Sequence, residues 1–141
     1  MGPVVQVNNA GINSGPKGNR LDYDNAKAIV GTNYYGVKNV TKGLLPLLLA
    51  SRAGARIVNV TSRLGLYDNV FKDEDKYTKE TEKLATKYVE DVKTGRAEEE
   101  GWMADNNSES KIFMNAYAVA VSKSLLKSQP EDHQILVATF C

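Results

Sequence analysis

The chain has 141 residues, of which 42% are hydrophobic and 25% are charged, which is enough for one ordinary hydrophobic core. Its 18 Lys and Arg nearly balance 17 Asp and Glu, and a net charge of +1 argues against a nucleic-acid or membrane-surface partner. The single cysteine, Cys141, cannot form an internal disulfide, and no apolar run is long enough to span a bilayer, so we expect a cytoplasmic protein.

The first part of the chain predicts a strand followed by a long helix. An apolar run over 4–8 ends in Asn8-Asn9-Ala10-Gly11, and a Gly- and Pro-containing loop follows over 13–20. Either Asp22 or Asp24 can cap the helix, and we expect Pro46 to kink its last turns. Apolar side chains at helical spacing predict one buried stripe, formed by Val30, Tyr34, Val37, Thr41, Leu44 and Leu48.

A second strand is predicted directly after this helix. Ile57, Val58 and Val60 form a short β-branched run, which is typical of a strand buried in a parallel sheet. Thr61 and Ser62 follow it, at the carboxyl end of the strand, where open α/β sheets bind their ligands. Strand, helix and strand over this length predict a βαβ unit.

The remainder of the chain predicts a charged helix, a second core helix and a last strand. Within 66–111, a thin apolar stripe indicates an amphipathic helix laid over the core, formed by Tyr77, Thr81, Leu84, Tyr88 and Val92. We interpret 95–110 as loop with Trp102 as its anchor, 112–127 as helix and 129–132 as a turn. The fold class is therefore α/β, with 4–8, 56–60 and 134–139 as parallel neighbours, flanking helices and an inserted charged helix.

Four short motifs stand in an order that resembles the middle of a short-chain dehydrogenase/reductase. They are Asn8-Asn9-Ala10-Gly11, Asn33-Tyr34-Tyr35-Gly36, Ser62-Arg63-Leu64-Gly65 and Ser122-Lys123. The charged insertion over 66–111, with its Gly101-Trp102 ending, is similar to that of the plant carbonyl reductase-like branch. The resemblance implies an incomplete Rossmann-like sheet of about three strands in one partial domain over 1–141. It also implies NADP as cofactor, a small carbonyl or secondary alcohol as substrate, and a monomer.

The resemblance also assigns roles to individual residues. Asn8, Asn9, Ala10 and Gly11 would border the adenosine side of the cofactor. Asn33 would hold a water of the proton relay, and Ser62 would hydrogen-bond the substrate carbonyl. Lys123 would bind the nicotinamide ribose and lower the pKa of a catalytic tyrosine, for which Tyr117 is the candidate. No metal-ligand spacing is present in the sequence.

The sequence departs from the family pattern in its phosphate loop. The family's glycine-rich loop belongs to a segment upstream of Met1, and the loop from Gly15 to Gly18 is a poor substitute because no helix clearly follows it. We therefore expect the chain to correspond to the middle half of the family domain, to bind NADPH weakly, and to expose an apolar sheet face prone to aggregation or edge pairing.

The second departure concerns the tyrosine. The family places it four residues before the lysine, but Val119 occupies that position and Tyr117 lies six residues before Lys123. In a continuous helix those side chains point about 120° apart. Tyr117 is then either the acid or a packing residue. Two functions stay open: an NADPH-dependent oxidoreductase impaired in this chain, or a non-catalytic remnant that binds another protein.

Overall fold

The computed structural model describes residues 3–15, 18, 20–63, 74–129 and 135–140. Its sheet has three strands, β1 (Val4–Asn8), β2 (Ala55–Val60) and β3 (Ile135–Phe140), in the order β1-β2-β3. Both pairs are parallel, with Val7 opposite Val58 and Val58 opposite Ala138. The predicted α/β class and the predicted neighbours are therefore confirmed.

The predicted long helix divides into three consecutive segments. Helix α1 (Tyr23–Val30) is followed by a π-helical segment, η1 (Gly31–Gly36), and then by α2 (Val37–Leu49), which continues past Pro46. Asp22 is the N-cap, because its carboxylate accepts a hydrogen bond from the Asn25 backbone N–H at 3.0 Å.

Most of the predicted stripe on this helix is buried, but the position of Leu44 was predicted wrongly. Val30, Tyr34, Val37, Thr41 and Leu48 are all buried, whereas Leu44 is 38% exposed. The next residue, Leu45, packs against the core cluster instead. The core position that follows Thr41 therefore lies four residues later, at Leu45, whereas the sequence predicted it three residues later, at Leu44.

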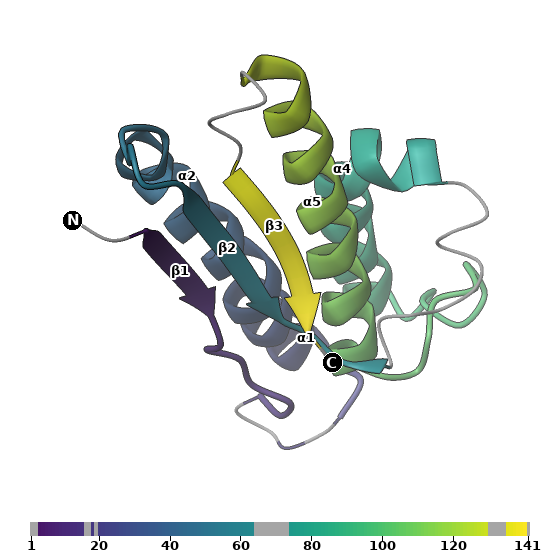
Figure 1. The fold of residues 1–141 in the computed structure, drawn as a ribbon. Helices are drawn as coiled ribbons and strands as arrows, with labels where there is room; N and C mark the ends of the chain where they lie inside the picture. The colour runs from purple at the N-terminus through teal and green to yellow at the C-terminus, as the bar shows by residue number, and fades with distance from the viewer. Residues whose placement is uncertain (1–2, 16–17, 19, 64–73, 130–134, 141) are drawn as a thin grey trace.

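Two further helices complete the described fold, α4 (Glu74–Lys93) and α5 (Asn106–Ser128). Helix α4 packs on α1 and α5, on the side of these two helices that faces away from the sheet (Figure 1). It is joined to them by one aromatic-rich cluster, against which Trp102 also packs: Ala26, Val30, Tyr34, Ala85, Tyr88, Val92, Ala97 and Phe113. The interpretation of a charged helix laid over the core, with Trp102 as an anchor, is confirmed.

The start of α5 corrects a second sequence-based assignment. Residues 106–110 were predicted as loop, but they form the first turns of α5. The Asp105 side chain starts the helix by accepting hydrogen bonds from the backbone N–H groups of Asn107 and Ser108. The polar residues of these turns concealed the helix, since their buried side chains are Asn106, Ser108, Glu109 and Ser110. Residues 130–132 of the predicted turn lie outside the described residues.

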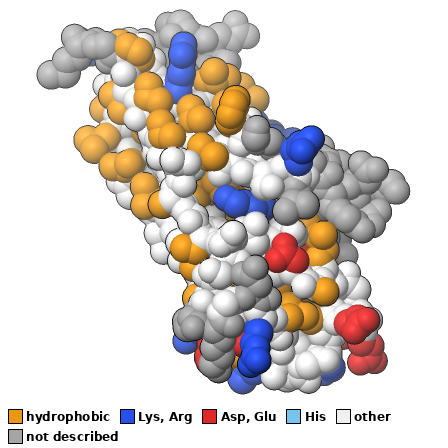
Figure 2. Space-filling view, turned by 90° about the horizontal axis from the view of Figure 1, so that it is seen from below, with side chains coloured by type: hydrophobic (Ala, Val, Ile, Leu, Met, Phe, Trp, Pro, Cys, Tyr) orange, Lys and Arg blue, Asp and Glu red, His pale blue; other side chains and the backbone are white. Residues whose placement is uncertain are grey.

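The two faces of the sheet have different surroundings. One face packs on α2 and α5 through a cluster formed by Leu48, Ala55, Ile57, Leu125 and Ile135. On the other face no described helix crosses the strands (Figure 1). Its side chains Val5, Val7, Leu136 and Phe140 are 50–69% exposed. Hydrophobic side chains also gather on one side of the molecule in Figure 2. None of the helices among the described residues is long and apolar enough to cross a bilayer.

Candidate active site at the carboxyl ends of the strands

A polar pocket of about 480 Å³ lies where β1 and β2 end. Three segments far apart in the sequence form it: the loop after β1, the end of β2 with the residues that follow, and the first turns of α5. Its described lining consists of Asn9, Gly11, Ile12, Asn13, Ser14, Val60, Thr61, Ser62, Asn107 and Lys111. This is the position at which open α/β sheets bind ligands.

Lys111 contributes the charge of this pocket. It is the only charged residue among the described residues that line it, and its Nζ donates a hydrogen bond to the Val60 carbonyl oxygen at 3.3 Å. The side chain is half-buried, and burial lowers the pKa of Lys111 because desolvation penalises the ammonium form. Gly11 permits the close approach of the loop, since a Cβ there would lie 3.2 Å from Asn33 Oδ1 and 3.5 Å from Lys111 Nζ.

Asn33 fixes the walls of the pocket relative to one another. It is fully buried in η1 and exchanges two hydrogen bonds of 2.8 Å with the backbone N–H and carbonyl of Ile12. Its Nδ2 also donates to Ser110 Oγ at 2.9 Å and to Asn107 Oδ1 at 3.3 Å. The π segment therefore carries the side chain that joins the loop after β1 to the start of α5.

The strand end that presents Ser62 is held by β3. The Thr61 N–H donates to the Phe140 carbonyl at 2.7 Å, which extends the ladder between β2 and β3 by one bond. Ser62 is the next residue and lines the pocket beside Lys111. Of the predicted catalytic residues, Ser62 therefore lines the pocket at the strand ends, and Asn33 is buried behind its walls.

Tyr117 lies elsewhere, within the aromatic cluster. Its ring packs edge-on to Tyr34 with centroids 6.2 Å apart, and its hydroxyl donates to the Lys38 carbonyl at 3.5 Å. Burial raises the pKa of Tyr117, because the phenolate would lose its hydration. Tyr117 is not among the described residues that line the strand-end pocket.

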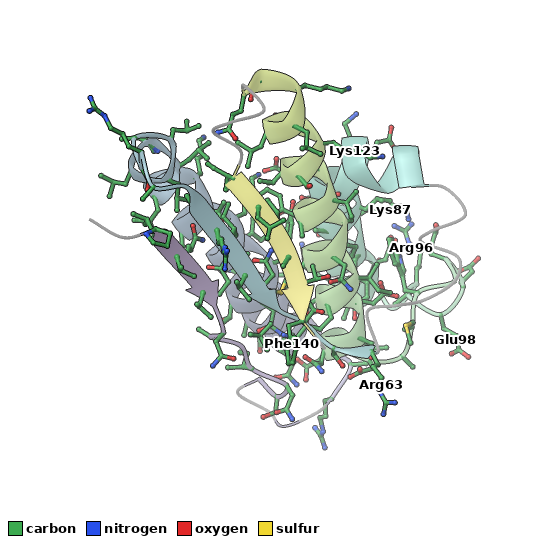
Figure 3. All side chains as sticks on the ribbon, in the orientation of Figure 1. Arg63, Lys87, Arg96, Glu98, Lys123 and Phe140 are labelled. Atoms are coloured by element: carbon green, nitrogen blue, oxygen red, sulfur yellow. The ribbon has the colours of Figure 1, made fainter. Side chains whose placement is uncertain are left out.

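Lys123 lies further along the same helix. Helix α5 is continuous over Asn106–Ser128, including the predicted helix over 112–127, so Lys123 is about 18 Å along the axis from Lys111. It lines a separate cavity of about 250 Å³ with Ala118, Val119, Ser122, Val137 and Thr139. Figure 3 shows Lys123 on the upper part of α5, whereas Arg63 and Phe140 mark the strand ends at the lower edge.

The four residues of the Asn8–Gly11 motif have different surroundings. The Asn8 side chain is buried on the helix-covered face of the sheet, where its Nδ2 donates to Asn59 Oδ1 at 2.8 Å and its Oδ1 accepts from Gln6. Asn9 and Gly11 line the pocket, and Ala10 is exposed outside its described lining. Only part of this motif therefore faces the space in which a ligand can lie.

Sequence reasoning missed several residues of the pocket, among them Asn107 and Lys111. The available signal was the pair Ser110-Lys111, which repeats the pair Ser122-Lys123 one segment earlier. Asn107 stands four residues before Lys111, so the two share one face of α5, and both line the pocket. This is the Tyr-to-Lys spacing of the family that the sequence resembles, with an amide in the place of the phenol.

The sequence matches the short chain dehydrogenase family over residues 4–73. The chain belongs to this family. It is 38% identical over 112 residues to (-)-isopiperitenone reductase of Mentha piperita, and this alignment covers 72% of the present chain and 35% of the relative. It is 30% identical over 143 residues to carbonyl reductase [NADPH] 1 of Mus musculus, and this alignment covers 95% of the present chain and 50% of the relative.

A third relative supports the plant carbonyl reductase-like branch. Salutaridine reductase of Papaver bracteatum is 34% identical over 118 residues, or 76% of this chain and 38% of the relative. The recognition made from the four motifs and the charged insertion is therefore confirmed. The chain spans between about a third and a half of the length of these relatives.

Proposed function

We propose that this chain forms the carbonyl-binding side of an NADP-dependent oxidoreductase site that acts on the carbonyl or secondary alcohol of a small molecule. The observation that carries the proposal is the convergence of Ser62 and Lys111 on one pocket at the strand ends, whose walls the buried Asn33 holds together. The reductase names of the relatives support the same chemistry. NADPH would supply the hydride, and the protein would orient the substrate.

The residues of the pocket fit the nicotinamide end of such a cofactor. The Lys111 Nζ and the Asn9 amide carry N–H donors suited to ribose hydroxyls, and Gly11 leaves space beside them. No pyrophosphate seat is found among the described residues. Helix α1 already holds the Asp22 carboxylate at its N-terminus, and Gly15 and Gly18 use their N–H groups to pair with each other.

Within this proposal, the roles carried over from the family are distributed differently along α5. Ser62 donates to the carbonyl oxygen, and Lys111 rather than Lys123 takes the position of the family lysine. Asn107 takes the position of the tyrosine, and a side-chain amide has no acidic proton to transfer. Tyr117 is then a packing residue of the aromatic cluster. We infer that proton transfer is impaired.

The amide at position 107 also favours a second candidate function, a non-catalytic chain that retains the family fold and binds ligand or protein without turnover. The two candidates differ in one respect that can be measured. In the first, restoring a phenol beside Lys111 restores carbonyl reduction. In the second, it does not.

The test is a pair of matched tyrosine substitutions in a complete domain. Residues 1–141 would replace the matching segment of the mouse carbonyl reductase, and NADPH-dependent carbonyl reduction would be measured. Asn107→Tyr should raise kcat by about 10²–10⁴-fold, the usual contribution of general acid catalysis. Val119→Tyr is the control, because it gives Lys123 the same spacing and should leave the rate unchanged. Activation by Val119→Tyr would contradict the proposal. So would a chimera that is already fully active and loses this activity on Tyr117→Phe. If neither added tyrosine raises the rate, the non-catalytic candidate is favoured.

A further inference from the structure

The amine of Lys111 has surroundings unlike those of the other lysines for which ion pairs are observed. Lys38 pairs with Glu82 at 2.7 Å, Lys87 with Asp91 and Glu100, and Lys93 with Glu90 at 3.3 Å. Among the described residues, no carboxylate lies within ion-pair distance of Lys111, and its observed acceptor is the neutral carbonyl of Val60. A half-buried ammonium without a counter-ion is destabilised relative to the neutral amine.

The consequence is a larger fraction of neutral amine at neutral pH. Burial lowers the pKa of Lys111, and none of the other described residues that line the pocket can titrate near neutrality to oppose this shift. A neutral lysine carries a free electron pair and is a nucleophile toward carbonyl carbon, and desolvation is one of the ways in which proteins activate it.

The pocket also provides space and polar groups around this amine. Its volume of about 480 Å³ is open to small molecules, and the Ser62 and Thr61 side chains line it together with the Asn107 amide. The Val60 carbonyl holds one N–H of the amine at the end of β2. Asn107, one turn before Lys111, is neutral and contributes no charge that would hold the ammonium form.

We propose that Lys111 is a nucleophilic lysine that captures small aldehydes and ketones as an imine. The Nζ electron pair forms a bond to the carbonyl carbon, and the carbonyl oxygen takes up a proton to give a carbinolamine. The oxygen then leaves as water with the second proton from Nζ, so the C=N bond forms with no change in oxidation state. The proposal rests on the proposed function only in taking a carbonyl compound as the ligand of this pocket.

The experiment traps the imine in the chain itself, without nicotinamide cofactor. The protein is incubated at neutral pH with butanal and sodium cyanoborohydride, which reduces the imine to a stable secondary amine, and alkylation is measured for each lysine by peptide mass spectrometry. Lys123 and Lys127 are the internal controls, because both are exposed on the same helix. We expect Lys111 to be alkylated several-fold faster than either, the reverse of the order that exposure alone would give.

Two variants separate nucleophilicity from access. Lys111→Arg should remove the fast alkylation and leave the rates at Lys123 and Lys127 unchanged. Asn107→Asp is nearly isosteric and keeps an acceptor for Asn33, but it places a carboxylate one turn from the amine, which favours the ammonium form and should suppress alkylation at Lys111 several-fold. Alkylation of Lys111 no faster than that of Lys123, or unaffected by Asn107→Asp, would overturn the proposal. Failure of carbonyl reduction in the chimera would not affect either result.

Discussion

Asn33 shows how one buried amide can position a pocket. Its carboxamide is shared between the backbone of Ile12 and the side chains of Ser110 and Asn107, so that three segments are held by one side chain. Buried amides are stabilising only when their donors and acceptors are satisfied, and here both ends of the amide have partners. Removing the Asn33 carboxamide leaves the Ile12 N–H without its acceptor and the Ile12 carbonyl without its donor.

Asn33→Ala should therefore lower the free energy of unfolding by about 1–3 kcal/mol, the usual cost of leaving buried polar groups unpaired. Asn39→Ala is the matched control, because Asn39 is exposed on α2 and its replacement should change stability by less than about 0.5 kcal/mol. Urea denaturation followed by circular dichroism measures both variants. Equal stability of the two would mean that the Asn33 hydrogen bonds do not hold the loop to α5.

Asn33 and Ser62 could be predicted because each is defined by a local pattern. Ser62 follows a β-branched strand with only Thr61 between them, and Asn33 belongs to the Asn33-Tyr34-Tyr35-Gly36 motif that resembles the family. Lys111 could not be predicted as a residue of the pocket, because two Ser-Lys pairs lie on the same helix and the choice between them depends on which end of α5 meets the strand ends. That in turn depends on the start of α5 at Asp105, which the polar composition of 105–110 concealed.

At the scale of elements, the strands were predicted well and the irregular helix was not. The parallel strands follow from short β-branched runs separated by a helix, and the predicted neighbours are the strands that pair. The π segment over Gly31–Gly36 has the same stripe as an α-helix in the sequence, so periodicity could not reveal it. Such segments often occur at functional sites, and this one carries Asn33.

The segment before α5 is fastened to the helix by a buried carboxyl group. Glu109 is 4% exposed in the first turn of α5, and its Oε1 accepts a hydrogen bond from the Met103 backbone N–H at 2.7 Å. Burial raises the pKa of Glu109 from 4.5 to about 7, and Asp105 adds to the rise, although the Met103 N–H opposes it. The folded state therefore keeps Glu109 protonated up to a higher pH than the unfolded chain does.

The linkage between protonation and folding gives a pH dependence with a definite sign. Between about pH 4.5 and 7 the folded chain binds more protons at Glu109 than the unfolded chain, so this group makes stability fall as the pH rises through that window, by at most about 3 kcal/mol. Glu109→Gln should remove this component and reduce the difference in urea midpoint between pH 5 and pH 8. An unchanged difference in the variant would show that Glu109 does not titrate in this window.

At the scale of the whole molecule, the sheet has one covered and one uncovered face among the described residues. The helices lie behind the strands in Figure 1, and the front face presents apolar side chains to solvent. In register across the three strands, Val5 is opposite Arg56 and Arg56 is opposite Leu136, while Val7, Val58 and Ala138 form the next row. An exposed apolar surface of this kind, next to open strand edges, favours association.

The isolated chain should therefore self-associate with increasing concentration, as measured by sedimentation equilibrium or by light scattering after gel filtration. Leu136→Lys places an ammonium on the uncovered face beside Arg56, where a contact would desolvate both charges. It should weaken association about tenfold or more, equivalent to about 1.4 kcal/mol. Leu126→Lys is the matched control, because Leu126 on α5 is 55% exposed against 59% for Leu136 but lies away from this face. A monomer at every concentration, or an equal loss of association in both variants, would show that the uncovered face does not drive self-association.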